Sequence, residues 1–246
     1  MYRAFNVSEG EIVAFAGAGG KSSAIVAMAR ELRAAGMKTL VVPTTKMFVE
    51  EADRIGPTVT AEDPHTLLEE AENALADAPV VVAGSSLLSR KRIAGIDPEA
   101  VKLLAGLADV TLVEADGSRR HPIKGTAPHE PALPPSATIV VAVASIRAFG
   151  QPATADHVHR PELFAEQTGI SAGQTITATA FARSLARGSL SRIPEHARSA
   201  ALITAVAPGP SMSDASAVAR ELWRLGVSTV VLASLPPDGP PQAWIA

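Results

Sequence analysis

A short glycine-rich segment carries the residue types that hold nucleotide phosphates. It follows the apolar run Ile12–Phe15 and reads Gly17-Ala18-Gly19-Gly20-Lys21-Ser22-Ser23. Glycines let backbone N–H groups approach phosphate oxygens, and the positive end of a following helix favours the same anion. In such a loop Lys21 reaches the β- and γ-phosphates, and the Ser22 hydroxyl ligates Mg²⁺. The segment therefore predicts binding of a nucleoside triphosphate, with ATP as the expected nucleotide.

The loop is shorter than a strict phosphate-binding loop. A glycine is expected five residues before Gly20, and this chain has Phe15 there. The spacing Gly17-x-x-Gly20-Lys21-Ser22 is closer to the compact loop of ATP-dependent amide ligases of the Mur type than to that of small GTPases. A glycine-rich turn with a solvated lysine is the alternative, but the order of strand, loop and helix favours phosphate binding.

Two carboxylates end another apolar run. Glu114 and Asp116 lie two residues apart in the segment 110–118, and alternate residues of a strand point to the same side. In phosphate-loop proteins an acid at the end of a core strand holds Mg²⁺ or orients the nucleophile. We therefore expect Asp116 to share Mg²⁺ with Ser22, and Glu114 or Glu130 to act as a base. A strand that ends in a solvated Asp-Gly turn is the alternative.

A polar segment follows the apolar run Thr39–Val42. It consists of Thr44, Thr45 and Lys46. Ligands of parallel sheets bind at the carboxyl ends of strands, so these residues are expected near the γ-phosphate or near a substrate that faces it. Lys46 would neutralise charge in a phosphoryl-transfer transition state. A polar turn without function is the alternative.

Two long polar segments, 116–135 and 151–162, supply a candidate site for a second, anionic small molecule. The residues expected to bind this substrate are Lys124, His129, His159 and Arg160. Arginine binds phosphate or carboxylate through two parallel hydrogen bonds. Long polar loops inside an α/β domain are more often functional than accidental.

Other charged or histidine-rich clusters leave alternatives open. Arg119-Arg120 and Arg90-Lys91-Arg92 would either join the second site or remain solvated. His157-x-His159 has a spacing that a transition metal accepts, although loop histidines more often form hydrogen bonds or face solvent.

The elements that position these residues alternate between apolar strands and helical patterns. This alternation predicts an α/β fold of the P-loop type, with a mostly parallel sheet between two layers of helices. Helices are expected from the glycine-rich segment to Gly36, at 64–77, at 98–107 and before Gly226. Strands are expected at Ile12–Phe15, Thr39–Val42, Val80–Ala83, Val110–Glu114, Thr138–Val143, Ala201–Val206 and Thr229–Ala233.

Composition narrows the class of protein further. The chain has 246 residues, 47% of them hydrophobic, which suits a single domain over 1–246 with a substantial core. A net charge of −3 without a basic run argues against nucleic-acid binding. The absence of cysteine excludes disulfides and thiolate metal sites. With no signal-peptide pattern and no apolar run of about 20 residues, we expect a cytoplasmic protein that does not enter a membrane.

Together the motifs resemble the YqeC family, the selenium-dependent hydroxylase accessory or selenium cofactor biosynthesis proteins. The segments that carry the resemblance occur in the family's order and are Gly17–Ser23, Thr44–Met47, Glu114–Ser118, Pro122–Lys124, His129–Pro131 and Val158–Arg160. The resemblance implies a P-loop nucleotide-binding protein that helps to mature a molybdenum hydroxylase, either with the apo-hydroxylase as partner or by preparing a selenium-containing cofactor.

The resemblance leaves two classes of activity open. One is Mg²⁺-dependent nucleotide hydrolysis or phosphoryl transfer to an unidentified small molecule. The other is a non-catalytic carrier that binds nucleotide or a pterin-type cofactor and hands it to the hydroxylase. Family members usually carry an Asn-based segment after the late strand, and this chain reads Thr204–Pro208, so guanine specificity has no support.

Overall fold

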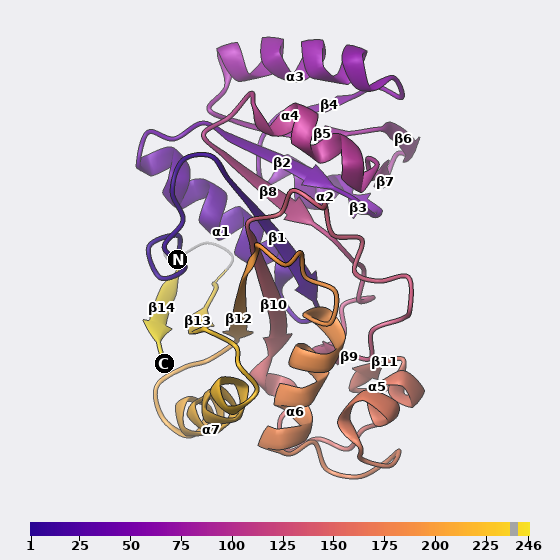
Figure 1. Cartoon of the computed structure of the whole chain (residues 1–246), viewed down its shortest axis with the longest axis vertical. Coiled ribbons are helices and arrows are strands. Elements are labelled where there is room, and N and C mark those ends of the chain that lie inside the picture. The colour runs from indigo at the N-terminus through magenta and orange to yellow at the C-terminus, as the bar shows by residue number, and fades with distance from the viewer. Residues whose placement is uncertain (237–240) are drawn as a thin grey trace.

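The computed structural model describes residues 1–236 and 241–246. Among them a nine-stranded sheet has the order β14-β13-β12-β10-β1-β8-β2-β5-β4 (Figure 1). Its strands are β1 (Glu11–Gly17), β2 (Thr39–Pro43), β4 (Thr58–Thr60), β5 (Val80–Gly84), β8 (Val110–Glu114), β10 (Ile139–Ser145), β12 (Arg198–Thr204), β13 (Thr229–Ser234) and β14 (Gln242–Ile245). Neighbouring strands are parallel, apart from the antiparallel pair β13–β14 at one edge. The mostly parallel α/β sheet expected from the sequence is confirmed.

Helices cover both faces of this sheet, because its strands are buried on both sides. Along β1, Ile12 and Ala14 face one core, and Val13 and Phe15 face the other. The longer helices are α1 (Lys21–Ala34), α3 (Pro64–Asp77), α5 (Pro161–Thr168), α6 (Ala178–Ser184) and α7 (Pro210–Arg224), and the short ones are α2 (Val49–Asp53) and α4 (Val101–Ala105). Helix α1 packs in one core, whereas α3 to α7 pack in the other, which gives the expected three layers (Figure 1).

Local signals explain the elements that match their expected bounds. Helix α3 spans the expected 64–77 because Asp63 accepts a hydrogen bond from the Thr66 N–H at 2.8 Å and a proline occupies the first turn. Its apolar residues Leu67, Ala71 and Leu75 recur every fourth position and are buried. Strand β8 has the expected bounds as well.

Other bounds differ from the expected ones. The helix expected at 98–107 is a 3-10 turn, Pro98–Ala100, followed by α4, which ends before Gly106. Strand β12 begins at Arg198 and ends at Thr204, so the expected strand Ala201–Val206 was displaced toward the C-terminus. Its first residues are a polar extension that pairs with β10, and an apolar run alone does not reveal such pairing.

Short strands escaped the sequence-based prediction altogether. One small antiparallel sheet has the order β3-β7-β6 and contains Met47–Phe48, Arg92–Ala94 and Ser86–Ser89. A second pairs β9 (Ile123–Lys124) with β11 (Val158–His159) in parallel. Segments of two to four residues are too short to show a period. The second pair joins the two long polar segments, so they form one structure beside the main sheet.

The carboxyl ends of the central strands meet at one edge, where parallel sheets bind ligands. Strand β1 lies between β10 and β8, and the segment that follows β1 leads directly into α1. Among the residues that the structure describes, no helix is long and apolar enough to cross a lipid bilayer.

Candidate functional site

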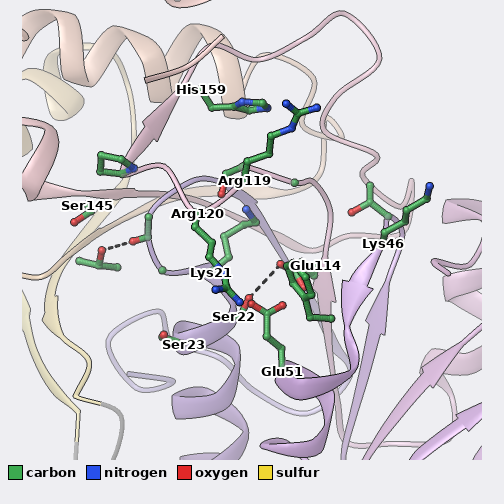
Figure 2. A pocket seen from close by; sticks show the side chains of 18 of the residues that line it. Lys21, Ser22, Ser23, Lys46, Glu51, Glu114, Arg119, Arg120, Ser145 and His159 are labelled. Carbon is green, nitrogen blue, oxygen red and sulfur yellow. Dashed lines mark hydrogen bonds between the residues drawn. The ribbon is translucent and has the colours of Figure 1, made fainter. Parts of the chain in front are cut away.

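A cleft of about 1810 Å³ opens at the carboxyl edge of the central sheet. Figure 2 shows Lys21, Ser22, Glu51 and Glu114 on its floor, in the same cavity as Lys46 and His159. The residues expected from the sequence that line the cleft are Gly19, Gly20, Lys21, Ser22, Ser23, Thr44, Thr45, Lys46, Glu114, His129, Glu130, His159 and Arg160. The other expected residues lie behind the cleft surface that the structure describes. They are Gly17, Ala18, Asp116 and Lys124.

The glycine loop, Gly17–Gly20, is held close to neighbouring backbone. Its three glycines have positive φ angles of 103°, 67° and 122°, which side chains disfavour. A Cβ on Gly17 would lie 2.3 Å from the Val143 carbonyl oxygen, and one on Gly19 would lie 2.4 Å from that of Pro122. The Ala18 N–H donates to Val143 at 2.8 Å. Glycine is therefore required for this path of the backbone.

The N-terminus of α1 faces the cleft without a cap. No side chain in the described part of the chain caps it, and its first turn holds no acidic residue. The first N–H groups of a helix have no partner within the helix, and its dipole is positive at this end. The first-turn residues Lys21, Ser22 and Ser23 line the cleft. Loop and helix together form a site suited to phosphate.

Lys21 is folded back against the loop. Its side chain is 4% exposed, and its ammonium donates to the Gly17 carbonyl at 2.6 Å and pairs with Asp116 at 3.0 Å. Burial alone would lower the pKa of Lys21, but the carboxylates of Asp116 and Glu114 outweigh it and raise the pKa above its usual value. Lys21 is therefore a cation.

Asp116 fastens the glycine loop from behind. Both of its carboxylate oxygens accept from the Gly17 N–H, at 3.0 and 2.9 Å, and they pair with Lys21 and Lys124. The residue is 1% exposed. This placement differs from the expected contact with Mg²⁺ beside Ser22. Glu114 and Asp116 would point to the same side only if one strand continued through both residues. This condition is not met, because β8 ends at Glu114.

Lys124 belongs to the same buried network and does not reach the cleft. Its ammonium donates to Asp116 at 3.0 Å, to the Gly117 carbonyl at 2.9 Å and to Glu130 at 2.5 Å, and the residue is 2% exposed. All three of its N–H donors are thus engaged. The expected contact between Lys124 and a second substrate disagrees with this burial.

Glu130 connects this network to the wall of the cleft. The Arg160 guanidinium binds both of its oxygens, at 2.6 and 3.1 Å. Burial would raise the pKa of Glu130, but Arg160 and Lys124 outweigh it and lower the pKa to about 2. Such a carboxylate is a poor proton acceptor near neutral pH, so the geometry does not favour Glu130 as a base.

Glu114 is the acid that faces Ser22. The Ser22 hydroxyl lies 3.4 Å from one oxygen of Glu114, and the other oxygen is buried with no hydrogen-bond partner among the described residues. Burial, together with the nearby carboxylates of Glu51 and Asp116, outweighs the effect of Lys21 and raises the pKa of Glu114 to about 7. Sequence analysis missed Glu51, because only the packing of α2 beside the loop brings it here (Figure 2).

We predict that Glu114→Gln stabilises the protein in a pH-dependent way. The folded-state pKa of about 7 lies above the unfolded value near 4.5, so ionisation of Glu114 opposes folding and stability falls as the pH rises between the two values. Relative to the native protein, the variant should gain about 2–3 kcal/mol of unfolding free energy between pH 4.5 and pH 8. Urea denaturation at both pH values measures this gain.

The matched control for this prediction is Glu50→Gln, at an exposed neighbour of Glu51 on α2. It should change the unfolding free energy by less than about 0.5 kcal/mol. Equal stabilisation of Glu114→Gln at both pH values would contradict the buried, desolvated state of Glu114.

The remaining expected residues lie around the rim. Thr44 donates its hydroxyl to the Ala132 carbonyl at 2.7 Å, whereas the buried Thr45 hydroxyl has no partner within residues 1–236 and 241–246. His159 stacks on His121 with ring centroids 5.6 Å apart, and burial with nearby Arg160 lowers its pKa to about 4. His129 is exposed. The described residues contain no cluster of three or more histidines and acids that is able to hold a metal ion.

Comparisons with known proteins agree with the motifs. The chain is 33% identical to the uncharacterized protein YqeC of Escherichia coli (strain K12) over 168 residues, which are 67% of this chain and 63% of that protein. The chain thus spans less than two thirds of the length of this relative. A crystal structure of FtsY from Mycoplasma mycoides is similar with a TM-score of 0.45 and 10% identity, over 95% of this chain and 63% of that one. The family model of the YqeC protein matches residues 13–162, so the chain belongs to the YqeC family.

Proposed function

We propose that this protein binds ATP with Mg²⁺ at the glycine loop and serves as an accessory protein in the maturation of a molybdenum hydroxylase. The observation that carries nucleotide binding is the uncapped N-terminus of α1, which opens behind the glycine loop into the cleft. The link to hydroxylase maturation and to selenium rests on the resemblance of the motifs to the YqeC family. Action in the cytoplasm stays a prediction.

The chain offers two kinds of donor to the phosphates. The first kind is the backbone N–H groups of Gly19 to Ser22, which lie at the start of α1. Two of the three N–H donors of Lys21 bind Gly17 and Asp116, which leaves one for a phosphate oxygen. Asp116 and the loop carbonyl therefore orient Lys21 before the ligand arrives.

Ser22 and Glu114 are the residues that would hold Mg²⁺, with Glu51 beside them. Mg²⁺ prefers oxygen ligands and is commonly bound by one or two carboxylates together with phosphates. The buried oxygen of Glu114 that has no partner in the described part of the chain fits this need. When bound, the ion neutralises charge on the phosphate oxygens. The geometry favours Glu114 over Asp116 for this role, because both oxygens of Asp116 are already engaged.

Phosphoryl transfer or hydrolysis needs a base and a charge-neutralising group. The pKa of Glu114, about 7, suits a proton acceptor near neutral pH, provided that the same carboxylate is not bound to the ion. Lys46 is exposed on the rim of the cleft, where it would approach the terminal phosphate or its acceptor. The Thr45 hydroxyl, which has no partner within the described ranges, is a further donor for that region.

We predict that Lys21→Ala lowers the affinity for a non-hydrolysable ATP analogue at least about tenfold. Loss of a charge-assisted contact costs about 1.5–3 kcal/mol. Titration calorimetry with Mg²⁺ measures the affinity, and circular dichroism checks that the variant is folded. Lys38→Ala, at an exposed residue before β2, is the control and should bind as the native protein does. Unchanged affinity in folded Lys21→Ala protein would exclude the glycine loop as the nucleotide site.

The maturation role has its own test. In a strain that lacks this protein, hydroxylase activity should be restored by the native chain and not by Lys21→Ala. If the chain binds the nucleotide, restores activity and yet never turns the nucleotide over, the non-catalytic carrier is the better description.

A further inference from the structure

We infer that the cleft binds a second, oxyanionic ligand on a cluster formed by Phe48, Arg92 and Arg120, here named the arginine clasp. The ligand is a small molecule that carries phosphate or carboxylate groups. The inference rests on the proposed function for the place of the first ligand, the nucleotide at the glycine loop. It names the chemical class of the second substrate. It also places the binding site of that substrate at the arginine clasp and not at Lys124, which is buried.

The clasp joins three separate segments of the chain. Phe48 ends β3 and pairs with Arg92 of β7 across the small antiparallel sheet, and Arg120 comes from the segment after β8. The Arg92 guanidinium carbon lies 3.4 Å from the centre of the Phe48 ring, and that of Arg120 lies 5.1 Å from it. All three residues line the cleft. One ring thus gathers two guanidinium groups at the wall of the cleft.

The two guanidinium groups have no negative partner among the described residues. Within the part of the chain that the structure describes, neither Arg92 nor Arg120 forms an ion pair with a carboxylate. Like charges on one ring repel, so an anion between them would stabilise the arrangement. Stacking of an arginine on a ring leaves its in-plane N–H groups available, and these match a phosphate or carboxylate in two-point fashion. The clasp is therefore a preformed oxyanion site.

Further cations line the same cleft as the clasp. Lys46, Arg119 and Arg147 line the cleft and likewise form no ion pair among the described residues. Figure 2 shows Arg119 and Arg120 at the same cavity as Lys21 and Glu114. Both arginines have positive φ angles, 48° and 64°, which non-glycine residues rarely adopt. Surrounding structure must hold them there, as is common at ligand sites.

The ends of two strands form an uncharged part of the cleft. Strands β12 and β13 lie on one side of β1, and their ends contribute Thr204, Ala205, Ser234, Leu235 and Pro236, none of which is charged. Strands β8, β2 and β5 lie on the other side, toward the clasp. This uncharged part suits a nucleoside, whereas the clasp on the other side of β1 and Arg147 after β10 supply cations for an additional anion. The volume of about 1810 Å³ exceeds the roughly 300–1,000 Å³ of a usual single-ligand pocket.

The test uses protein saturated with a non-hydrolysable ATP analogue and Mg²⁺, so that the glycine loop is occupied. Inorganic phosphate and malonate are then titrated separately by calorimetry. We expect at least one of them to bind, and the better probe tells a phosphoryl ligand from a carboxylate ligand. Arg92→Lys keeps the charge but loses the two-point geometry, and should weaken this binding at least about fivefold. Phe48→Leu should weaken it as well, because the ring that gathers the arginines is lost.

The matched control is Arg90→Lys, at an exposed arginine between β6 and β7 that does not line the described cleft. Arg90→Lys should leave anion binding unchanged, and all three variants should bind the ATP analogue within about twofold of the native protein. Absence of anion binding to the saturated protein would overturn the inference. A loss of ATP-analogue affinity in Arg92→Lys would overturn it too, because the clasp would then hold the nucleotide's own phosphates.

Failure of the proposed nucleotide site would give different binding results from failure of the clasp. If folded Lys21→Ala binds the ATP analogue normally, the nucleotide site is misplaced, whatever the clasp does. The same anion titrations are then carried out on nucleotide-free protein, with Arg92→Lys as the comparison. They test on their own whether the clasp binds an anion. Equal binding to native protein and Arg92→Lys would overturn it there.

Discussion

Replacing Lys124 by methionine is expected to lower the free energy of unfolding by about 3 kcal/mol or more. Lys124 holds Asp116 and Glu130 together inside the protein, and it is almost fully buried. Its loss leaves two buried carboxylates with less compensation, and that cost exceeds the gain from removing one buried cation. Each carboxylate keeps one other cation, Lys21 or Arg160, so the lower end of the range of about 3–5 kcal/mol is expected. Urea denaturation measures the change.

Two comparisons separate this network from a general effect of losing a lysine. Lys38→Met removes an exposed lysine and should cost less than about 0.5 kcal/mol. Adding Glu130→Gln to Lys124→Met removes one of the two carboxylates left with less compensation and should recover part of the loss, as expected for residues in one network. A Lys124→Met protein as stable as Lys38→Met would contradict the buried network.

The same network changes what Lys124 is expected to do for function. From the sequence, its replacement should spare nucleotide binding and abolish recognition of a second substrate. In the structure Lys124 supports Asp116, which fastens Gly17 and orients Lys21. We therefore expect Lys124→Met to weaken nucleotide binding as well. Calorimetry with the ATP analogue measures this.

Local patterns made most of the main sheet predictable. β-Branched runs identify β2, β5, β8 and β13 nearly to the residue, because strands buried on both faces appear as continuous apolar segments. The strand, glycine loop and helix at the start of the chain were equally evident, since glycine has a steric role there.

Contacts between distant segments were not predictable in this way. Alternate residues of a strand point to the same side, and on this ground Asp116 was expected beside Glu114. However, β8 ends at Glu114, and Asp116 instead binds the Gly17 N–H behind the glycine loop. Glu51 and the clasp residues Phe48 and Arg92 reach the cleft through short elements that leave no periodic signal. The residue types of the site were visible in the sequence, whereas their division into buried support and cleft surface depends on tertiary packing.

Replacing Glu114 by glutamine is expected to remove most of the gain in ATP affinity that Mg²⁺ provides. The carboxylate next to Ser22 has a buried oxygen without a partner among the residues that the structure describes, and an amide in its place carries no charge to attract the ion. Calorimetric titrations of the ATP analogue with Mg²⁺ and with EDTA give the gain for each protein. Where the native protein gains about tenfold or more, Glu114→Gln should gain less than about twofold, while binding in EDTA is kept or improved.

Three further variants decide which acid faces the ion. Glu51→Gln should reduce the Mg²⁺ gain less than Glu114→Gln does, because the Ser22 hydroxyl donates to Glu114. Exposed Glu50→Gln should leave the gain unchanged. Asp116→Asn is the decisive comparison. Because Asp116 binds the loop N–H and two lysines, this variant should weaken binding with and without Mg²⁺ to a similar extent. If Asp116→Asn instead abolished the Mg²⁺ gain while Glu114→Gln kept it, Asp116 would be the acid that holds the ion, as the sequence alone suggested.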